Sequence, residues 1–168
     1  MAGDNKSKSD VNEVEHQQLA PQPVLSIRAV VRIEQLGEAM GDRIEALRSY
    51  LQQQGVQPAG PPYVRYHTFG EVETDLETGV PLVAPIEGEG RIEGGELPGG
   101  PAATTWHFGA HDKLGDAYGR IAAWQKEHSR MSDGAAWEVY HWIDLSHDLD
   151  PSKWDPSTWG TQLVQPVK

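Results

Sequence analysis

The sequence predicts an α+β fold made of two β-α-β-β units, related by pseudo-twofold symmetry and forming a central ligand groove. Segments that alternate between apolar and polar residues, as strands do, flank segments with apolar residues at three- and four-residue spacing, as in helices. The same order of segments recurs about 74 residues later, so the second half repeats the first. Grooves between two such halves are common ligand sites.

The first unit is expected within about residues 24–85. Alternation in VLSIRAVVRI predicts a strand over residues 24–33. An amphipathic helix should follow and stop at Gly55, and YVRYHTF (63–69) and residues 75–83 predict two further strands before Pro85. The apolar face of the helix consists of Leu36, Met40, Ile44, Leu47 and Leu51.

The second unit is expected within about residues 98–168. ATTWHF (103–108), AAWEVYHWI (135–143) and TQLVQPV (161–167) predict its strands. Its helix presents Leu114, Tyr118, Ile121 and Trp124. Residues 88–100, between the units, are rich in Gly and Glu; the carboxylates would repel phosphate and no Gly-Lys-Ser/Thr follows, so a linker or hairpin crossing is favoured over a phosphate loop.

The repeat has a consistent register. At a spacing of 74 residues Tyr66 aligns with Tyr140, and Tyr63 aligns with Trp137. Pro81 and Pro166 align only at a spacing of 85, which indicates an insertion of 11 residues, roughly DLDPSKWDPST, in the second unit. Trp154 and the neighbouring Trp159 either form a lid over the groove or anchor this loop to the surface.

Composition narrows the function. The 25 acidic against 14 basic residues give a formal net charge of −11, with no basic cluster, so we expect no nucleic-acid partner. The apolar runs are too short for a membrane span, and MAGDNKSKSD lacks the apolar core of a secretory signal, so we expect no membrane partner and a cytoplasmic location. Residues 1–22 are predicted to be a disordered tail before a domain at 23–168.

A carboxylate lies among large aromatic residues near the end of the chain. In the strand expected within GAAWEVYHWIDL, the period of two places Glu138, Tyr140 and Trp142 on one face and Trp137 on the other. Glu138 is therefore either a partly desolvated acid that stabilises a ligand cation or an exposed glutamate beside core aromatics. Tyr140 can equally be a core residue with a hydrogen-bonded hydroxyl.

Two other candidates remain open or unfavoured. Trp106 shares a strand face with Thr104 and Phe108, and it either packs beneath the helix or lines the groove. His107 and His111 have zinc-ligand spacing, but the intervening Gly109 and the strand-like TTWHF argue against a shared helix, so we expect no metal site and no cofactor.

The segments PPYVRYH, DLETGVPL, ELPGGPAATTWHFGAH, AAWEVY and TQLVQPV, in this order, resemble the GyrI-like small-molecule-binding domain, found also as the effector-binding domain of multidrug-sensing bacterial transcription activators. The resemblance implies a duplicated fold whose cleft takes bulky aromatic or lipophilic cationic compounds, with the acidic Glu138 facing that cleft. It implies roles at the ligand for Glu138 and for Tyr66, the aromatic residue at the matching end of the first unit. The hypothesis of drug binding adds stacking of the ligand on Tyr66, Tyr140, Trp106 and Trp142. There is no room before the first strand for a helix-turn-helix, so we expect no direct regulation of DNA.

Three functions follow as hypotheses. The leading one is a stand-alone multidrug-binding protein that sequesters or senses planar aromatic and lipophilic cationic compounds, with drug sequestration or resistance as its role. The alternative is a hydrolase that opens the cyclopropane of DNA-alkylating natural products, with Glu138 as general base and Tyr66 as proton donor. The third is an interaction with DNA gyrase, which the family name suggests but no residue pattern marks.

Overall fold

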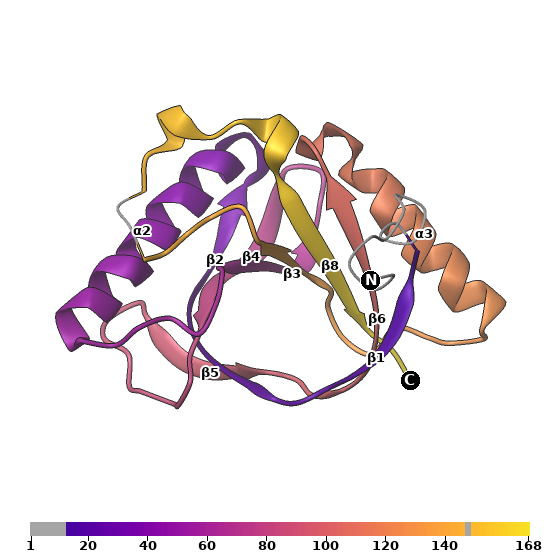
Figure 1. Ribbon diagram of the computed structural model, residues 1–168, viewed down its shortest axis with the longest axis horizontal. Coiled ribbons are helices and arrows are strands. Elements are labelled where there is room, and N and C mark those ends of the chain that lie inside the picture. Colours follow the sequence, from indigo (N-terminus) through magenta and orange to yellow (C-terminus); the bar gives the residue numbers. More distant parts are fainter. Residues whose placement is uncertain (1–12, 147–148) are drawn as a thin grey trace, which may run out of the picture.

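In the computed structural model, which describes residues 13–146 and 149–168, eight strands form one curled antiparallel sheet with two helices against one face (Figure 1). No helix among these residues has the length and apolar character needed to cross a membrane. The helices are α2 (Leu36–Gln54) and α3 (Leu114–Glu127). The strands are β1 (Glu15–Leu19), β2 (Gln22–Arg32), β3 (Tyr63–Phe69), β4 (Glu73–Pro81), β5 (Glu93–Leu97), β6 (Gly100–Phe108), β7 (Trp137–Tyr140) and β8 (Gly160–Pro166).

The strand order confirms the duplicated fold. It reads β1-β6-β8-β7-β3-β4-β2-β5, so the two units meet at the central β7–β3 pair. Moving outward from this pair, β3 corresponds to β7, β4 to β8 and β2 to β6. Val64 lies directly opposite Glu138, and these two positions are also related by the spacing of 74 residues. The pseudo-twofold axis therefore passes through the Val64–Glu138 pair.

The outermost strands correct two expectations. Residues 15–22, expected in a disordered tail, form β1 and the start of β2, and the expected linker at 88–100 contains β5. Each leading strand crosses to the other unit: β1 precedes β2 but pairs with β6, and β5 precedes β6 but pairs with β2. The sequences of β1 and β5 are polar and mostly exposed, and they show no apolar alternation. Such alternation is not needed there, because main-chain hydrogen bonds at the sheet edge hold these strands in place. The rest of the tail, residues 1–12, lies outside the described residues.

The helices bury their apolar stripes on the same face of the sheet. Helix α2 covers β2 and β4, and α3 covers β6 and β8. Ile44, Leu47 and Leu51 of α2 are buried as expected, and Gly55 ends the helix in the left-handed conformation at φ 68°. Because both helices pack on one face, the central residues of that face, among them Val64 and Leu163, are buried.

Strand β7 is shorter than predicted, because it ends at Tyr140 rather than continuing through Trp142. Its partner β3 begins at Tyr63, where the Tyr140 N–H donates to the carbonyl of Pro62 at 3.0 Å. The preceding residues Pro61 and Pro62 have no N–H groups to continue the ladder. The chain therefore turns after Tyr140, and Trp142 reaches the cleft from a turn instead of a strand.

Gly79 of β4 is required by close packing across the sheet. A Cβ atom there would lie 2.5 Å from ring atoms of the buried Tyr63. We expect Gly79→Ala to lower the free energy of unfolding by about 2 kcal/mol in urea titrations, because the Tyr63 ring would have to shift and so disturb the hydrogen bond that its hydroxyl donates to Glu77. Gly95→Ala is the control, since its Cβ would meet only Val24 Cγ2 at 3.9 Å. Equal stability of the two variants would contradict this account.

Candidate functional site

Glu138 lies at the centre of the sheet on its helix-covered face. Its neighbours in register are Val64 and Leu163, which are both fully buried, and only 3% of Glu138 itself is exposed. The carboxylate accepts hydrogen bonds from two tyrosines. The Tyr118 hydroxyl, on α3, donates to Oε2 at 2.5 Å, and the Tyr140 hydroxyl donates to Oε1 at 2.8 Å.

Burial dominates the electrostatics of this group. It raises the pKa of the Glu138 carboxyl above its usual range, and the hydrogen bonds from Tyr118 and Tyr140 offset part of the rise. Burial and then the charge of Glu138 raise the pKa of Tyr66, Tyr118 and Tyr140, so all three stay protonated at neutral pH. The site thus holds one titratable carboxyl among three neutral hydroxyls.

A cavity of about 240 Å³ adjoins this tyrosine cluster, between α2 and the turn after β7. Tyr140 belongs to both, because its ring lines the cavity while its hydroxyl reaches Glu138 and lies 3.7 Å from Met40 Sδ. Glu138 does not line the cavity directly. The remaining lining residues are glycine, isoleucine or aromatic: Gly37, Gly41, Ile44, His111, Trp142, Ile143, Trp154 and Trp159.

The aromatic walls contact one another. Trp142 stacks on Trp159 at 3.9 Å between ring centroids, and it meets Trp154 edge-on at 5.1 Å. His111 approaches Tyr140 at 5.3 Å and Trp159 at 5.0 Å, and partial burial lowers its pKa, which favours the neutral ring. Trp154 and Trp159 thus both line the cavity and anchor their loop to Trp142, so both roles expected for these two residues stay open.

The structure brings together four of the five residues predicted to bind ligand. Glu138, Tyr66 and Tyr140 share the helix-covered face, and Trp142 lines the adjoining cavity. Trp106 does not join them. It pairs with Gln162 on the opposite face, where it lies 5.8 Å from Phe108 and 4.5 Å from the His141 ring.

Sequence reasoning missed several residues of the site. Tyr118 was assigned only to the apolar face of its helix, although the matching residue of the first unit, Ile44, has no hydroxyl, and that difference was the available signal. His111 was considered only as a metal ligand; in the structure its Nε2 lies 2.9 Å from Thr161 Oγ1. Met40 was placed in the core, and its distance to Tyr140 has no signature in the sequence.

Residues 12–144 match the GyrI-like small molecule binding domain family. The chain belongs to this family. The fold of the GyrI-like domain agrees with the crystal structure of the EcmrR C-terminal domain, at 21% identity and a TM-score of 0.71, covering 93% of this chain and 97% of that one. It spans 57% of the EcmrR chain in the cryo-EM structure of the EcmrR–DNA complex, at 20% identity, 93% coverage of this chain and a TM-score of 0.77.

Two further structures share the fold at lower identity. A hydrolase encoded by lin2189 from Listeria innocua is 13% identical, with a TM-score of 0.65 and coverage of 94% of this chain and 92% of that one. SAV2435 bound to tetraphenylphosphonium is also 13% identical, with a TM-score of 0.57 and coverage of 93% and 94%. The comparison with curated proteins found none that matches the sequence of this chain. At these identities the structural matches establish the fold, and the residues themselves must carry any argument about ligands.

The position of Glu138 gives a stability prediction. Because its pKa is raised in the folded state, the native protein is favoured while the carboxyl is protonated, and stability falls as pH rises through that pKa. Glu138→Gln removes this titration. We expect its melting temperature to exceed that of the parent protein by about 2–4 °C at neutral pH, or about 1 kcal/mol, and the gap to close near pH 4.

The matched control is Glu77→Gln, on the opposite face of the sheet. Glu77 accepts a hydrogen bond from Tyr63, and its Oε1 lies 2.7 Å from His67 Nε2, so neutralising it should not raise the melting temperature. Thermal scans between pH 4 and pH 8 compare the two variants. A stabilisation by Glu138→Gln that is the same at every pH would contradict the burial argument.

Proposed function

We propose that this GyrI-like domain reversibly binds planar aromatic and lipophilic cationic molecules in the cleft beside α2, and so sequesters or senses such compounds in the cytoplasm. The observation that carries the proposal is the coupling of an aromatic cavity to a buried carboxylate through one residue, Tyr140. Ring faces attract cations, by about 0.5–2 kcal/mol each, and Glu138 supplies a full compensating charge behind them.

Burial of the Glu138 carboxylate favours lipophilic cations as ligands. It disfavours anions, and it disfavours ligands that are strongly hydrated. A protonated Glu138 has no charge to offer, but a bound cation stabilises the ionised form, so binding draws the proton off. Tyr118 and Tyr140 keep the resulting carboxylate hydrogen-bonded. Lipophilic cations lose little hydration on entering such a cleft, whereas ammonium ions lose much more.

Binding of a bulky ligand requires this cavity to enlarge. At about 240 Å³ it is below the range of about 300–1,000 Å³ typical of small-molecule sites. The side chains best placed to yield are Trp154 and Trp159, which belong to the insertion between β7 and β8 and not to the sheet. A bulky ligand should therefore separate the stacked Trp142–Trp159 pair and change tryptophan emission.

The test is titration with tetraphenylphosphonium and with rhodamine 6G, followed by intrinsic fluorescence and by isothermal calorimetry. Tetraphenylphosphonium is a suitable probe because SAV2435, which shares the fold, has been captured with it. We expect saturable one-to-one binding with a change in tryptophan emission. The proposal fails if both cations leave the emission unchanged and release no heat.

A hydrolase is the second candidate, and one observation favours it. A carboxyl whose pKa is raised toward neutrality, surrounded by tyrosyl O–H groups, has the components of a general base with hydrogen-bond donors. Since only 3% of Glu138 is exposed, water could reach it only after the cleft opens. A cyclopropane-bearing indole distinguishes the two functions: a binder protects it in equimolar amounts, whereas a hydrolase consumes an excess and loses this activity in Glu138→Gln.

A further inference from the structure

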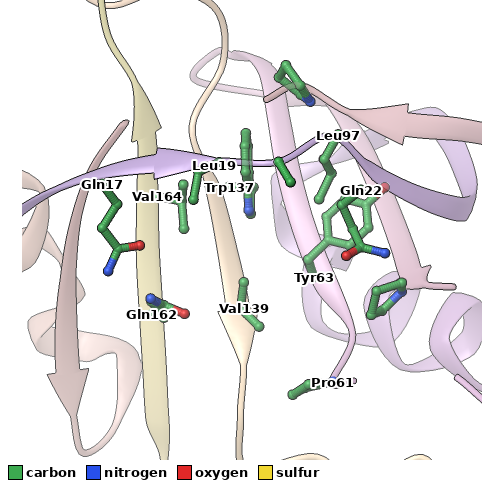
Figure 2. Close-up of a pocket in the computed structure, with 13 residues that line it drawn as sticks. Gln17, Leu19, Gln22, Pro61, Tyr63, Leu97, Trp137, Val139, Gln162 and Val164 are labelled. Atoms are coloured by element: carbon green, nitrogen blue, oxygen red, sulfur yellow. The ribbon is translucent and has the colours of Figure 1, made fainter. Parts of the chain in front are cut away.

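A second cavity lies on the opposite face of the sheet from Glu138 (Figure 2). Its volume is about 390 Å³, within the range of about 300–1,000 Å³ usual for small-molecule sites. Strand β7 separates it from the cleft, because Glu138 and Tyr140 face the helices whereas the alternate residues Trp137 and Val139 line this cavity. The two cavities therefore share a strand but no lining residue.

The roof of this cavity is the chain between β1 and β2. In Figure 2 the segment that carries Gln17, Leu19 and Gln22 crosses in front of β8, β7 and β3. This segment is fixed by contact with the chain between β5 and β6, since a Cβ on Gly99 would lie 2.7 Å from Pro21 Cδ and 2.9 Å from the Leu19 carbonyl oxygen. The segment from β1 to β2 forms one wall of the cavity, and β3, β7 and β8 form the other. Because all of these strands belong to one sheet, the cavity is preformed.

The lining chemistry selects an uncharged, mainly apolar ligand. None of its thirteen lining residues carries a charge, and the polar side-chain groups are the glutamine amides, the Tyr63 hydroxyl and the Trp137 indole N–H. That hydroxyl already donates to Glu77, and the Gln22 amide donates to two main-chain carbonyls. Gln162 is different, because its Oε1 lies 3.1 Å from His141 Nε2, which leaves its amide N–H groups to orient a ligand acceptor. The apolar lining is Leu19, Ala20, Pro61, Pro81, Leu97, Pro98, Trp137, Val139 and Val164.

The side chain of Trp137 gives the cavity a planar wall. It is 4% exposed, and the Arg65 guanidinium carbon lies 5.4 Å from its ring centroid. A cation already occupies part of the ring's electrostatic field, so a second cation gains little there. A carboxylate, Glu77, also lies behind Tyr63 on this face, but its Oε1 lies 2.7 Å from His67 Nε2. In the cleft, by contrast, the hydrogen-bond partners of Glu138 are tyrosine hydroxyls. The two faces of β7 are thus suited to ligands of different charge.

We propose that this cavity is a second small-molecule site, which takes a neutral, largely apolar molecule with a hydrogen-bond acceptor directed at Gln162. The site is independent of the cation site proposed above. Apolar contact with Trp137, Val139 and Val164 supplies most of the binding free energy, and the amide of Gln162 sets orientation.

The test uses the neutral fluorophore 6-propionyl-2-(dimethylamino)naphthalene, whose ketone oxygen is a hydrogen-bond acceptor, and a reciprocal pair of variants. Val139→Phe fills this cavity from β7, and Gly41→Phe fills the cleft from α2, where a Cβ meets nothing within 4 Å. We expect saturable binding of the fluorophore to the parent protein, at least about tenfold weaker binding by Val139→Phe, and a change of less than about twofold in Gly41→Phe. Tetraphenylphosphonium should not displace the fluorophore.

Gln17→Phe is a second variant that fills the cavity, in case Val139→Phe does not fold. Gln17 lies on the opposite wall at a partly exposed position. This variant should weaken the fluorophore equally, and NOEs from the bound fluorophore should reach the methyl groups of Val139 and Val164. The proposal is overturned if the parent protein shows no saturable binding, or if Gly41→Phe abolishes binding that both other variants retain. If the parent protein binds the fluorophore but not tetraphenylphosphonium, only the proposed cation site is contradicted.

Discussion

Glu138→Gln is expected to weaken the binding of tetraphenylphosphonium by about 30-fold, or about 2 kcal/mol. Tyr140 lies between the carboxylate and the cavity. Two opposite charges about 7 Å apart interact by about 2 kcal/mol at an effective dielectric constant of about 20, which sets the size of the effect. Calorimetric titration of parent and variant at pH 7.5 measures it directly, and affinity for a neutral planar indole should stay the same.

Acid should reproduce the effect in the parent protein. As pH falls through the raised pKa of Glu138, the carboxyl is protonated and affinity for the cation should drop. The other ionisable groups around it are Tyr66, Tyr118 and Tyr140, which stay neutral in this range, and His111 on the cavity wall, which would repel the cation once protonated. Glu138→Gln keeps His111, so it isolates the contribution of the carboxylate. An equal pH dependence in the variant would assign the effect to His111.

Val64→Asp is expected to cost about 4 kcal/mol of stability at pH 7, or about 8–16 °C in melting temperature. Val64 is fully buried and lies directly opposite Glu138, so the substitution places two carboxyls side by side in an apolar layer. Both cannot ionise there, and neither gains a cationic partner. Urea unfolding monitored by circular dichroism gives the free energy.

Val64→Asn separates charge from polarity, since Asn has nearly the shape of Asp. We expect about half the loss from Asn, and we expect Glu138→Gln to restore part of the stability of Val64→Asp. At pH 4 the Asp and Asn variants should become similar. If they are equally unstable at pH 7, the two positions do not interact and the proposed axis is misplaced.

Periodicity was sufficient to predict the fold because the two units bury regular apolar stripes. The helices, the central strands and the stop at Gly55 agree with expectation. Strands β1 and β5 could not be predicted, because edge strands are held by main-chain hydrogen bonds that leave no apolar alternation in the sequence. The early end of β7 follows from prolines in the partner segment before β3, so it depends on a pairing between the units that local sequence does not reveal.

The site was predictable only where it lies on a strand. The period of two placed Glu138 and Tyr140 on one face, and the same rule grouped Trp106 with Phe108 without saying which face that group would occupy. Tyr118 reaches Glu138 from α3, the helix of the same unit, and such a contact between a helix and a strand is set by tertiary packing. The tryptophans of the insertion were identified as a possible lid, but their stacking on Trp142 required coordinates.

The pair of residues on the pseudo-twofold axis, Val64 and Glu138, shows what a single chain with two units permits. The reciprocal exchange of β1 and β5 between the units is the arrangement of a strand-swapped homodimer whose two subunits have become one chain. In a homodimer, any residue on the axis would face its own copy, so a glutamate at this position would face a glutamate. In this single chain the two units differ in sequence at the axis, with Val64 on one side and Glu138 on the other. A single buried carboxylate on the axis is therefore possible only because both units belong to one chain.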